Sequence, residues 1–177
     1  RFAKALNVTK FGTPNFIAYA RFPKWYFCPK CREFRPIGEW EQIARRKKCD
    51  DSFCMVESLR CPKDRVQLTA TRFVTVCENG HLDDFPWVEW VHARSKRSIC
   101  SNPSLKIKSA SHSEAADGIS VECSCGAWAN LKGIFNRGVF KELEEESGIK
   151  FRCTGYHPHK QVKEDCDRYP IVTLKGA

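Results

Sequence analysis

The sequence predicts an α+β fold of short strands and a few helices, arranged in small zinc-ribbon-like modules that structural zinc stabilises. Three observations lead to this prediction. The chain of 177 residues contains 11 cysteines, and most of them occur in close pairs. Segments rich in β-forming residues run directly into these pairs, and the few helical stretches are short. Hydrophobic residues make up 42% of the chain, which is enough for a folded core and argues against a disordered tail.

The N-terminal region, residues 1–72, is predicted to be a strand region followed by a zinc ribbon. Residues 15–27 are rich in aromatic and β-forming side chains and lead into Cys28-Pro-Lys-Cys31, as strands do in zinc ribbons. A short helix is expected over residues 38–44. Residues 66–76 alternate as a strand does.

The remaining region, residues 73–177, is predicted to be a second zinc-binding domain. Asp83 followed by Pro86 has the pattern of a helix start, with an acidic cap and then a proline in the first turn. A further helix is expected over residues 139–146, with Gly148 as its stop signal.

Polar and small residues separate these two helices. Residues 101–118 are punctuated by proline and glycine and are predicted to be a loop or linker with one β-like piece at 105–108. Residues 119–122 are predicted to be a short strand that leads into the Cys123-Ser-Cys125 turn.

The apolar residues of the helix that is expected to start near Asp83 are predicted to stabilise the fold rather than to bind a ligand. They are Phe85, Trp87, Trp90 and Val91, and we expect them to be largely buried. The alternative is an aromatic platform that stacks on single-stranded bases.

Close cysteine pairs suit zinc, because two thiolates two to four residues apart can bind one tetrahedral ion from a tight turn. A disulfide framework is the main alternative, and it needs an oxidising compartment. The odd number of cysteines, the CxxC spacing and the interleaved histidines favour zinc over disulfides or mostly free thiols.

The first predicted site is anchored by Cys28 and Cys31. Three thiols, Cys49, Cys54 and Cys61, are available for its two remaining positions, and the spacing of Cys49 and Cys54 favours that pair. Cys61-Pro-Lys-Asp64 looks like a second CPxC turn in which aspartate replaces the last cysteine. The two remaining ligand positions could therefore also be filled by Cys61 together with Cys54, or even by the Asp64 carboxylate.

The two other predicted sites follow the order of the chain. The second is expected to use Cys77, His81, His92 and Cys100, although His92 could equally be a capping or packing histidine. The third is expected to use Cys123, Cys125, Cys153 and Cys166. His157 and His159 lie nearby in an HPH stretch that is typical of a surface turn.

These thiolate-rich sites are predicted to be structural, with two to three zinc ions per chain and no enzymatic activity. A catalytic zinc keeps an open position for water, usually among histidine or carboxylate ligands. The sequence contains no phosphate-binding loop, HExxH or GxSxG motif. The pair Asp83-Asp84 is better explained by helix capping than by paired catalytic carboxylates.

The net charge of +9 and a pI near 9.1 favour anionic partners, with nucleic acid first among them. A basic surface that only keeps the protein soluble is the alternative. Two groups of cations are the candidate DNA-binding residues: Arg45, Arg46, Lys47 and Lys48, and then Arg94, Lys96 and Arg97. The first group would also suit the C-terminal end of a helix dipole.

No apolar run approaches the length needed to span a bilayer, and no signal-peptide pattern opens the chain, so a cytoplasmic location is expected. The chain begins at Arg1 rather than at methionine. We therefore expect it to be a piece of a larger polypeptide.

One segment resembles a known family. Residues 72–92, RFVTVCENGHLDDFPWVEWVH, are close to the RFV-x-x-C-x-x-GH-[IL]-DDFPW-x-x-W-V-H signature of the DrmB family of the DISARM anti-phage defence system. RFPKW at residues 21–25 and the spacing of the later cysteines agree with that family. This sequence departs from the family pattern at His157-Pro158-His159 and at Asp64.

The resemblance implies a non-enzymatic, zinc-binding partner of a SNF2-like helicase, DrmA, in a complex that engages invading DNA. The competing hypothesis is a purely structural zinc scaffold that holds a protein partner and never contacts DNA.

Overall fold

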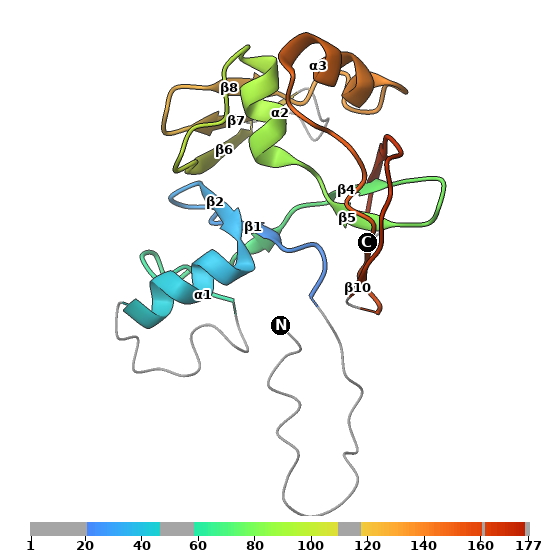
Figure 1. Ribbon diagram of the computed structural model, residues 1–177. Coiled ribbons are helices and arrows are strands. Elements are labelled where there is room, and N and C mark those ends of the chain that lie inside the picture. The colour runs from blue at the N-terminus through green and yellow to red at the C-terminus, as the bar shows by residue number, and fades with distance from the viewer. Residues whose placement is uncertain (1–20, 47–58, 110–117, 161, 176–177) are drawn as a thin grey trace, which may run out of the picture.

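The computed structural model describes residues 21–46, 59–109, 118–160 and 162–175. It confirms the α+β class: within these ranges, three helices accompany mostly antiparallel strands (Figure 1). None of these helices has the length and apolar character that crossing a membrane requires.

The largest sheet has six strands in the order β3-β1-β2-β6-β7-β8. All its neighbouring strands are antiparallel. The strands are β1 (Trp25–Phe27), β2 (Glu33–Pro36), β3 (Thr69–Ala70), β6 (Leu105–Ser109), β7 (Ile119–Cys123) and β8 (Trp128–Asn130).

This sheet crosses the predicted domain boundary at residue 72. Phe34 of β2 pairs with Leu105 of β6, so strands from the two predicted regions share one hydrogen-bonded sheet. The Asp84 carboxylate adds a second connection, because it accepts the backbone amide of Lys24 at 2.8 Å.

A three-stranded sheet has the order β11-β4-β5. Its strands are β4 (Phe73–Val76), β5 (Leu82–Asp84) and β11 (Ile171–Leu174). A short hairpin of β9 (Tyr156–His157) and β10 (Val162–Lys163) lies beside it.

The three helices occupy different parts of the molecule. Helix α1 (Ile37–Arg46) packs near β2 at the lower left of Figure 1, whereas α2 (Trp87–Arg94) lies against β7 and β8. Helix α3 (Val139–Ser147) contacts α2. It ends at Gly148, which has φ of 70°, as the predicted stop signal required.

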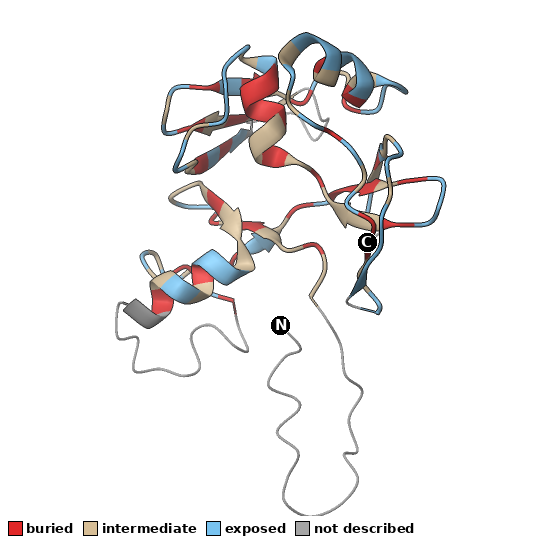
Figure 2. Cartoon of the chain, viewed as in Figure 1, coloured by how far each residue is buried: buried red, intermediate tan, exposed pale blue. Residues whose placement is uncertain are grey.

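The main core lies between α2, α3 and the strands β6, β7 and β8 (Figure 2). As predicted, Phe85, Trp87, Trp90 and Val91 are all buried in it. A smaller, separate core surrounds Trp40 of α1, whose indole Nε1 donates to the carbonyl of Tyr26.

The β-like piece predicted at 105–108 is confirmed: residues 105–109 are a strand inside the large sheet, and Leu105 and Ile107 are buried while Lys106 and Lys108 are exposed, the alternation of a half-buried strand. The predicted start of the next helix was wrong. Residue Asp83 does not cap a helix: it lies in β5, and α2 begins only after Pro86, without a side-chain cap.

Two predicted strands were too long. Of residues 15–27, only 25–27 form a strand, and residues 15–20 lie outside the described ranges. Residues 66–76 are divided between β3 and β4.

Candidate metal centres

The nine cysteines of the described residues are all free thiols, and each belongs to one of three four-residue clusters. In every cluster the potential ligand atoms lie within 4.8 Å of one another. The first cluster is Cys28, Cys31, Cys61 and Asp64; the second is Cys77, His81, Cys153 and Cys166; the third is His92, Cys100, Cys123 and Cys125.

The first cluster is built from two equivalent turns. Cys28-Pro-Lys-Cys-Arg and Cys61-Pro-Lys-Asp-Arg share four of their five residues. In each turn the amide of the fourth residue lies near the Sγ of the first, at 3.4 Å for Cys31 and 3.5 Å for Asp64.

The backbone of the two turns is also the same. Each ends in an arginine in the left-handed region, with φ of 64° at Arg32 and 61° at Arg65, and this arginine amide donates to the carbonyl of the first cysteine. Asp64 therefore stands where the second cysteine of a knuckle would stand, with one carboxylate oxygen 3.5 Å from Cys28 Sγ and 3.6 Å from Cys61 Sγ.

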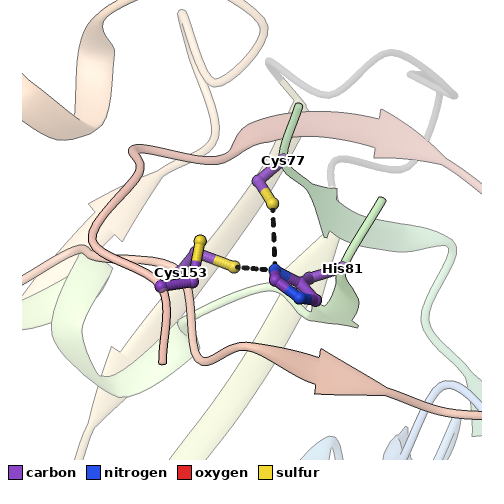
Figure 3. Close-up of side chains that lie close together, drawn as sticks. Cys77, His81 and Cys153 are labelled. Carbon is purple, nitrogen blue, oxygen red and sulfur yellow. Dashed lines mark hydrogen bonds between the residues drawn. The ribbon is translucent and has the colours of Figure 1, made fainter. Parts of the chain in front are cut away.

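The second cluster joins the turn between β4 and β5 to two distant cysteines. Figure 3 shows Cys77 and Cys153 pointing at His81, whose Nδ1 lies 3.3 Å and 3.6 Å from their sulfurs. Cys153 and Cys166 flank the β9–β10 hairpin, so the hairpin closes over the cluster between two of its members.

The base of this hairpin places a carboxylate on the far side of His81. The Glu164 amide donates to the carbonyl of Gly155, and a Cβ at Gly155 would clash with the Glu164 carbonyl. Glu164 Oε1 then lies 2.5 Å from His81 Nε2. Because a carboxylate only accepts hydrogen bonds, Nε2 carries the proton and Nδ1 presents its lone pair to the sulfurs.

The third cluster repeats this arrangement with the nitrogens exchanged. His92 is fully buried on α2, and its Nδ1 lies 2.7 Å from the carbonyl of Val88, which can only accept. The proton is therefore on Nδ1, and Nε2 presents its lone pair to Cys125 Sγ at 3.4 Å. Cys100 and Cys123 complete the cluster, with their sulfurs 3.7 Å apart.

The spacing within the clusters fits zinc. Zn–S bonds of about 2.3 Å in a tetrahedron place neighbouring sulfurs about 3.8 Å apart. The sulfurs of Cys31 and Cys61 are 3.9 Å apart, and those of Cys100 and Cys123 are 3.7 Å apart. With three thiols and one histidine or carboxylate each, the donor sets suit a borderline-soft ion.

In the second and third clusters, the pKa of one thiol is raised and that of another is lowered. Burial, together with neighbouring sulfurs, raises the pKa of Cys153 to about 12 and that of Cys100 to about 11. At Cys77 and Cys123 burial acts in the same direction, but hydrogen bonds led by backbone amides of their turns outweigh it and lower the pKa. Thiols this close cannot all ionise unless a cation compensates their charge.

The predicted grouping of the second and third sites was wrong. Cys77 and His81 meet Cys153 and Cys166, whereas His92 and Cys100 meet Cys123 and Cys125. Helix α2 is the physical reason, because it carries His92 away from His81 and onto the β7–β8 turn. The interleaving of two sites along the chain leaves no signal in local spacing.

Several predicted residues lie outside the described part of the chain. They are Cys49, Cys54, Lys47 and Lys48, together with the side chains of Arg45 and Arg46. Of the three thiols considered for the first site, Cys61 lies beside Cys31, in the arrangement with Asp64 that the sequence had left open.

The pair Asp83-Asp84 connects strands rather than capping a helix. Asp84 accepts the amides of Lys24 and Trp25, and Asp83 accepts the hydroxyl of Thr154. Burial raises the pKa of Asp84 to about 6, against the lowering effect of the two amides.

His157 was expected to lie in a surface turn, yet it also approaches the second cluster. Its ring is 4.5 Å from that of His81, and its Nε2 is 3.4 Å from Glu164 Oε1. Sequence reasoning missed Glu164 altogether, since an acidic residue two positions before Cys166 has no distinguishing signal until the hairpin places it.

The comparisons with known proteins agree with these motifs. The chain is 32% identical over 161 residues to the DISARM protein DrmB of Bacillus paralicheniformis, an alignment that covers 88% of this chain. The chain spans about a quarter of the length of that relative, since the alignment covers 25% of it. The predicted resemblance to DrmB is confirmed. A family model described as a domain of unknown function, DUF8724, matches residues 1–177. The chain therefore belongs to the DUF8724 family.

Proposed function

We propose that this chain is a non-enzymatic, zinc-stabilised module of a DrmB-type protein that contacts DNA and a helicase partner in anti-phage defence. The observation that carries the zinc assignment is the hydrogen bonding of the two cluster histidines. In each one, an acceptor outside the cluster takes the N–H, and the remaining lone pair points at cysteine sulfur.

The donor sets favour a structural role over a catalytic one. Each cluster offers four protein ligands, which is the full coordination shell of tetrahedral zinc and leaves no position for a reactive water. Thiolates are also strong electron donors and make zinc a poor Lewis acid. Zinc bound at such sites would supply folding energy rather than chemistry on a substrate.

Each of the three clusters draws its ligands from at least two separate segments of the chain. The first joins the two equivalent turns beside the small core. The second holds the β4–β5 turn to the two ends of the β9–β10 segment. The third holds α2 to the β7–β8 turn. Each cluster thus joins segments far apart in sequence.

The turn after α2 is the best-supported DNA contact. We call Arg94, Lys96 and Arg97 the basic turn; all three are exposed, and none makes an ion pair within the described residues. Arg97 donates to the carbonyl of Cys125 at 3.1 Å, which fixes the turn to the third cluster. Arg94 lies over the Trp90 ring at 5.4 Å. Exposed cations without carboxylate partners are suited to phosphate contacts that position a protein without reading sequence.

The acidic helix α3 does not neutralise the basic turn. Its Glu144 pairs with Arg152 at 3.1 Å, and its Glu145 pairs with Lys141 at 3.9 Å. The scaffold hypothesis predicts cations that are either dispersed or paired with the acidic helix, and the second of these arrangements is not seen for the basic turn within the described residues.

The proposal is tested by reversing the basic turn to Arg94→Glu, Lys96→Glu and Arg97→Glu and measuring affinity for a duplex oligonucleotide at several salt concentrations. Loss of three phosphate contacts should flatten the log–log salt slope by about 2.7 and weaken binding at low salt. A matched control reverses Arg137, Lys141 and Lys150, which are also exposed and change the net charge equally. Equal losses in both variants would mean that only net charge matters, and unchanged affinity would contradict the DNA role.

A protein-only scaffold is the second candidate. It is favoured by β11, an edge strand whose Ile171 and Leu174 side chains are each 49% exposed. If the reversed basic turn binds DNA normally but loses the helicase partner, the scaffold hypothesis is correct.

A further inference from the structure

The solvent face of the large sheet carries an exposed tryptophan beside the basic turn. We infer that Trp128 is a stacking platform for an unpaired base of single-stranded DNA. This inference rests on the proposed DNA contact and goes beyond it, because it names the form of DNA and the residue that receives a base.

Strand pairing places Trp128 on the solvent face. In β8 the neighbouring Ala129 is buried, and successive side chains of a strand point to opposite faces. Trp128 is paired with Glu122 of β7, which is paired in turn with Lys106 of β6, so the three side chains form one row. At 51%, Trp128 is the most exposed large hydrophobic side chain in the described ranges.

The backbone of this tryptophan is fixed by hydrogen bonds on its outer side. Ser95 Oγ donates to the carbonyl of Trp128 and accepts its amide, both at 2.7 Å. Trp90 Nε1 donates to the carbonyl of Asn130 at 3.0 Å. These side chains of α2 and its C-cap occupy the outer edge of β8, which therefore does not offer these groups to another strand.

The same hydrogen bonds set the position of the cations. Ser95 lies between Arg94 and Lys96 in sequence, so its bond to Trp128 brings the basic turn alongside the strand. On the sheet face, Lys106 and Lys108 are exposed, with Lys108 paired to Glu122 at 2.7 Å. A base on Trp128 would thus have the basic turn on one side for a flanking phosphate, and on the other side a Glu122 carboxylate that Lys108 neutralises.

An exposed aromatic ring with flanking cations is the chemistry that recognises single strands. Every base has a π-face, so stacking on tryptophan is tolerant of sequence, while the cations follow the backbone. In duplex DNA the bases are already stacked on one another, and Trp128 has no free face to meet. Sheets that bind single strands use exposed aromatic residues in this way.

The experiment compares Trp128→Ala and Trp128→Phe with the wild-type chain, using oligodeoxythymidine and a duplex of the same length. We expect Trp128→Ala to weaken binding to oligodeoxythymidine by about 5- to 150-fold, the range for one stacked base. Trp128→Phe should recover part of the loss, and duplex affinity should not change. Phe135→Ala removes another exposed aromatic ring, one that faces Phe73, and serves as the control.

Intrinsic fluorescence gives a direct readout. Of the five tryptophans, Trp40, Trp87 and Trp90 are buried and Trp25 is partly buried against Phe34, so quenching by oligodeoxythymidine should come mainly from Trp128 and should be largely lost in Trp128→Phe. If Trp128→Ala binds oligodeoxythymidine as wild type does, while reversal of the basic turn still weakens duplex binding, the stacking inference is wrong and the proposed function stands. If wild type binds neither DNA, both are wrong.

Discussion

The first cluster and the third cluster use the same type of site in surroundings that differ greatly in packing. The small core beside the first cluster contains seven buried residues, and two of them, Cys28 and Cys61, are themselves cluster cysteines. The third cluster lies at the rim of the main core, where 19 buried residues pack together. Helix α1 and the two equivalent turns therefore have little besides the metal site to hold them, whereas β2 also packs into the main core through Phe34.

The largest effect is expected from Cys28→Ser. It removes a ligand where the local core is too small to compensate, and metal binding there is coupled to folding. We expect hydrogen exchange of the amides of α1 and of residues 59–68 to rise to the rate of an unfolded segment, while amides of β6 and β7 stay protected.

Cys125→Ser is the matched control in the third cluster, and it should cost local order without unfolding the main core. Cys61→Ser should behave as Cys28→Ser does, because the two cysteines hold equivalent turns. Uniform loss of protection in all three variants would contradict the comparison.

The main core should respond to packing instead. Trp90 is fully buried and contacts the rings of Phe85 and Phe140. We expect Trp90→Ala to lower the free energy of unfolding by about 3–5 kcal/mol. Chemical denaturation of the zinc-loaded chain measures this. A change below about 1 kcal/mol would show that zinc, rather than apolar packing, also stabilises the part of the chain around the main core.

Two substitutions near the clusters should change metal affinity in opposite directions. Asp64→Cys restores a fourth thiolate in the first cluster and should tighten zinc binding there. Glu164→Gln weakens the hold on the His81 tautomer and should loosen the second site by about 10- to 100-fold.

Competition with a chromogenic chelator measures both affinities, and cobalt substitution reports the ligand set through its absorption. A cobalt spectrum that keeps the intensity of four-coordinate binding in Glu164→Gln would identify Glu164 as a positioning residue rather than a ligand. If zinc is lost stoichiometrically instead, Glu164 itself is a ligand.

The smallest effect concerns Asp84, which joins the two regions at Lys24. Its pKa is raised in the folded protein to about 6, so the folded state holds the proton more tightly than the unfolded state does. The resulting stabilisation is complete below about pH 4 and is lost as pH rises through 6, by up to about 1.4 kcal/mol per pH unit.

Asp84→Asn keeps an oxygen for the Lys24 amide and should remove that slope. Urea denaturation of both proteins between pH 4.5 and pH 7, at saturating zinc, makes the comparison. Parallel pH profiles would show that Asp84 does not titrate as described.

The sequence was informative where a signal is local. The CPxC turn, the buried aromatic residues of α2 and the helix stop at Gly148 all depend on neighbouring residues, and each was predicted correctly. The α+β class followed from the same local patterns.

The failures share one cause, which is that they depend on contacts distant in sequence. The pairing of His92 with Cys125 and the use of Asp84 by Lys24 arise only once α2 and β5 are placed. The β-like piece at 105–108 was predicted, but its place between β2 and β7 in the large sheet depends on pairing with strands distant in sequence. The carboxylate of Glu164 reaches His81 only through the β9–β10 hairpin.

Zinc content per chain tests the central claim most directly. Metal analysis after purification without added metal should find three zinc ions per chain, one for each cluster. Cys31→Ser, Cys153→Ser and Cys125→Ser should each reduce the number to two without affecting the other sites. A chain that contains no zinc, with its thiols oxidised to disulfides, would contradict the account.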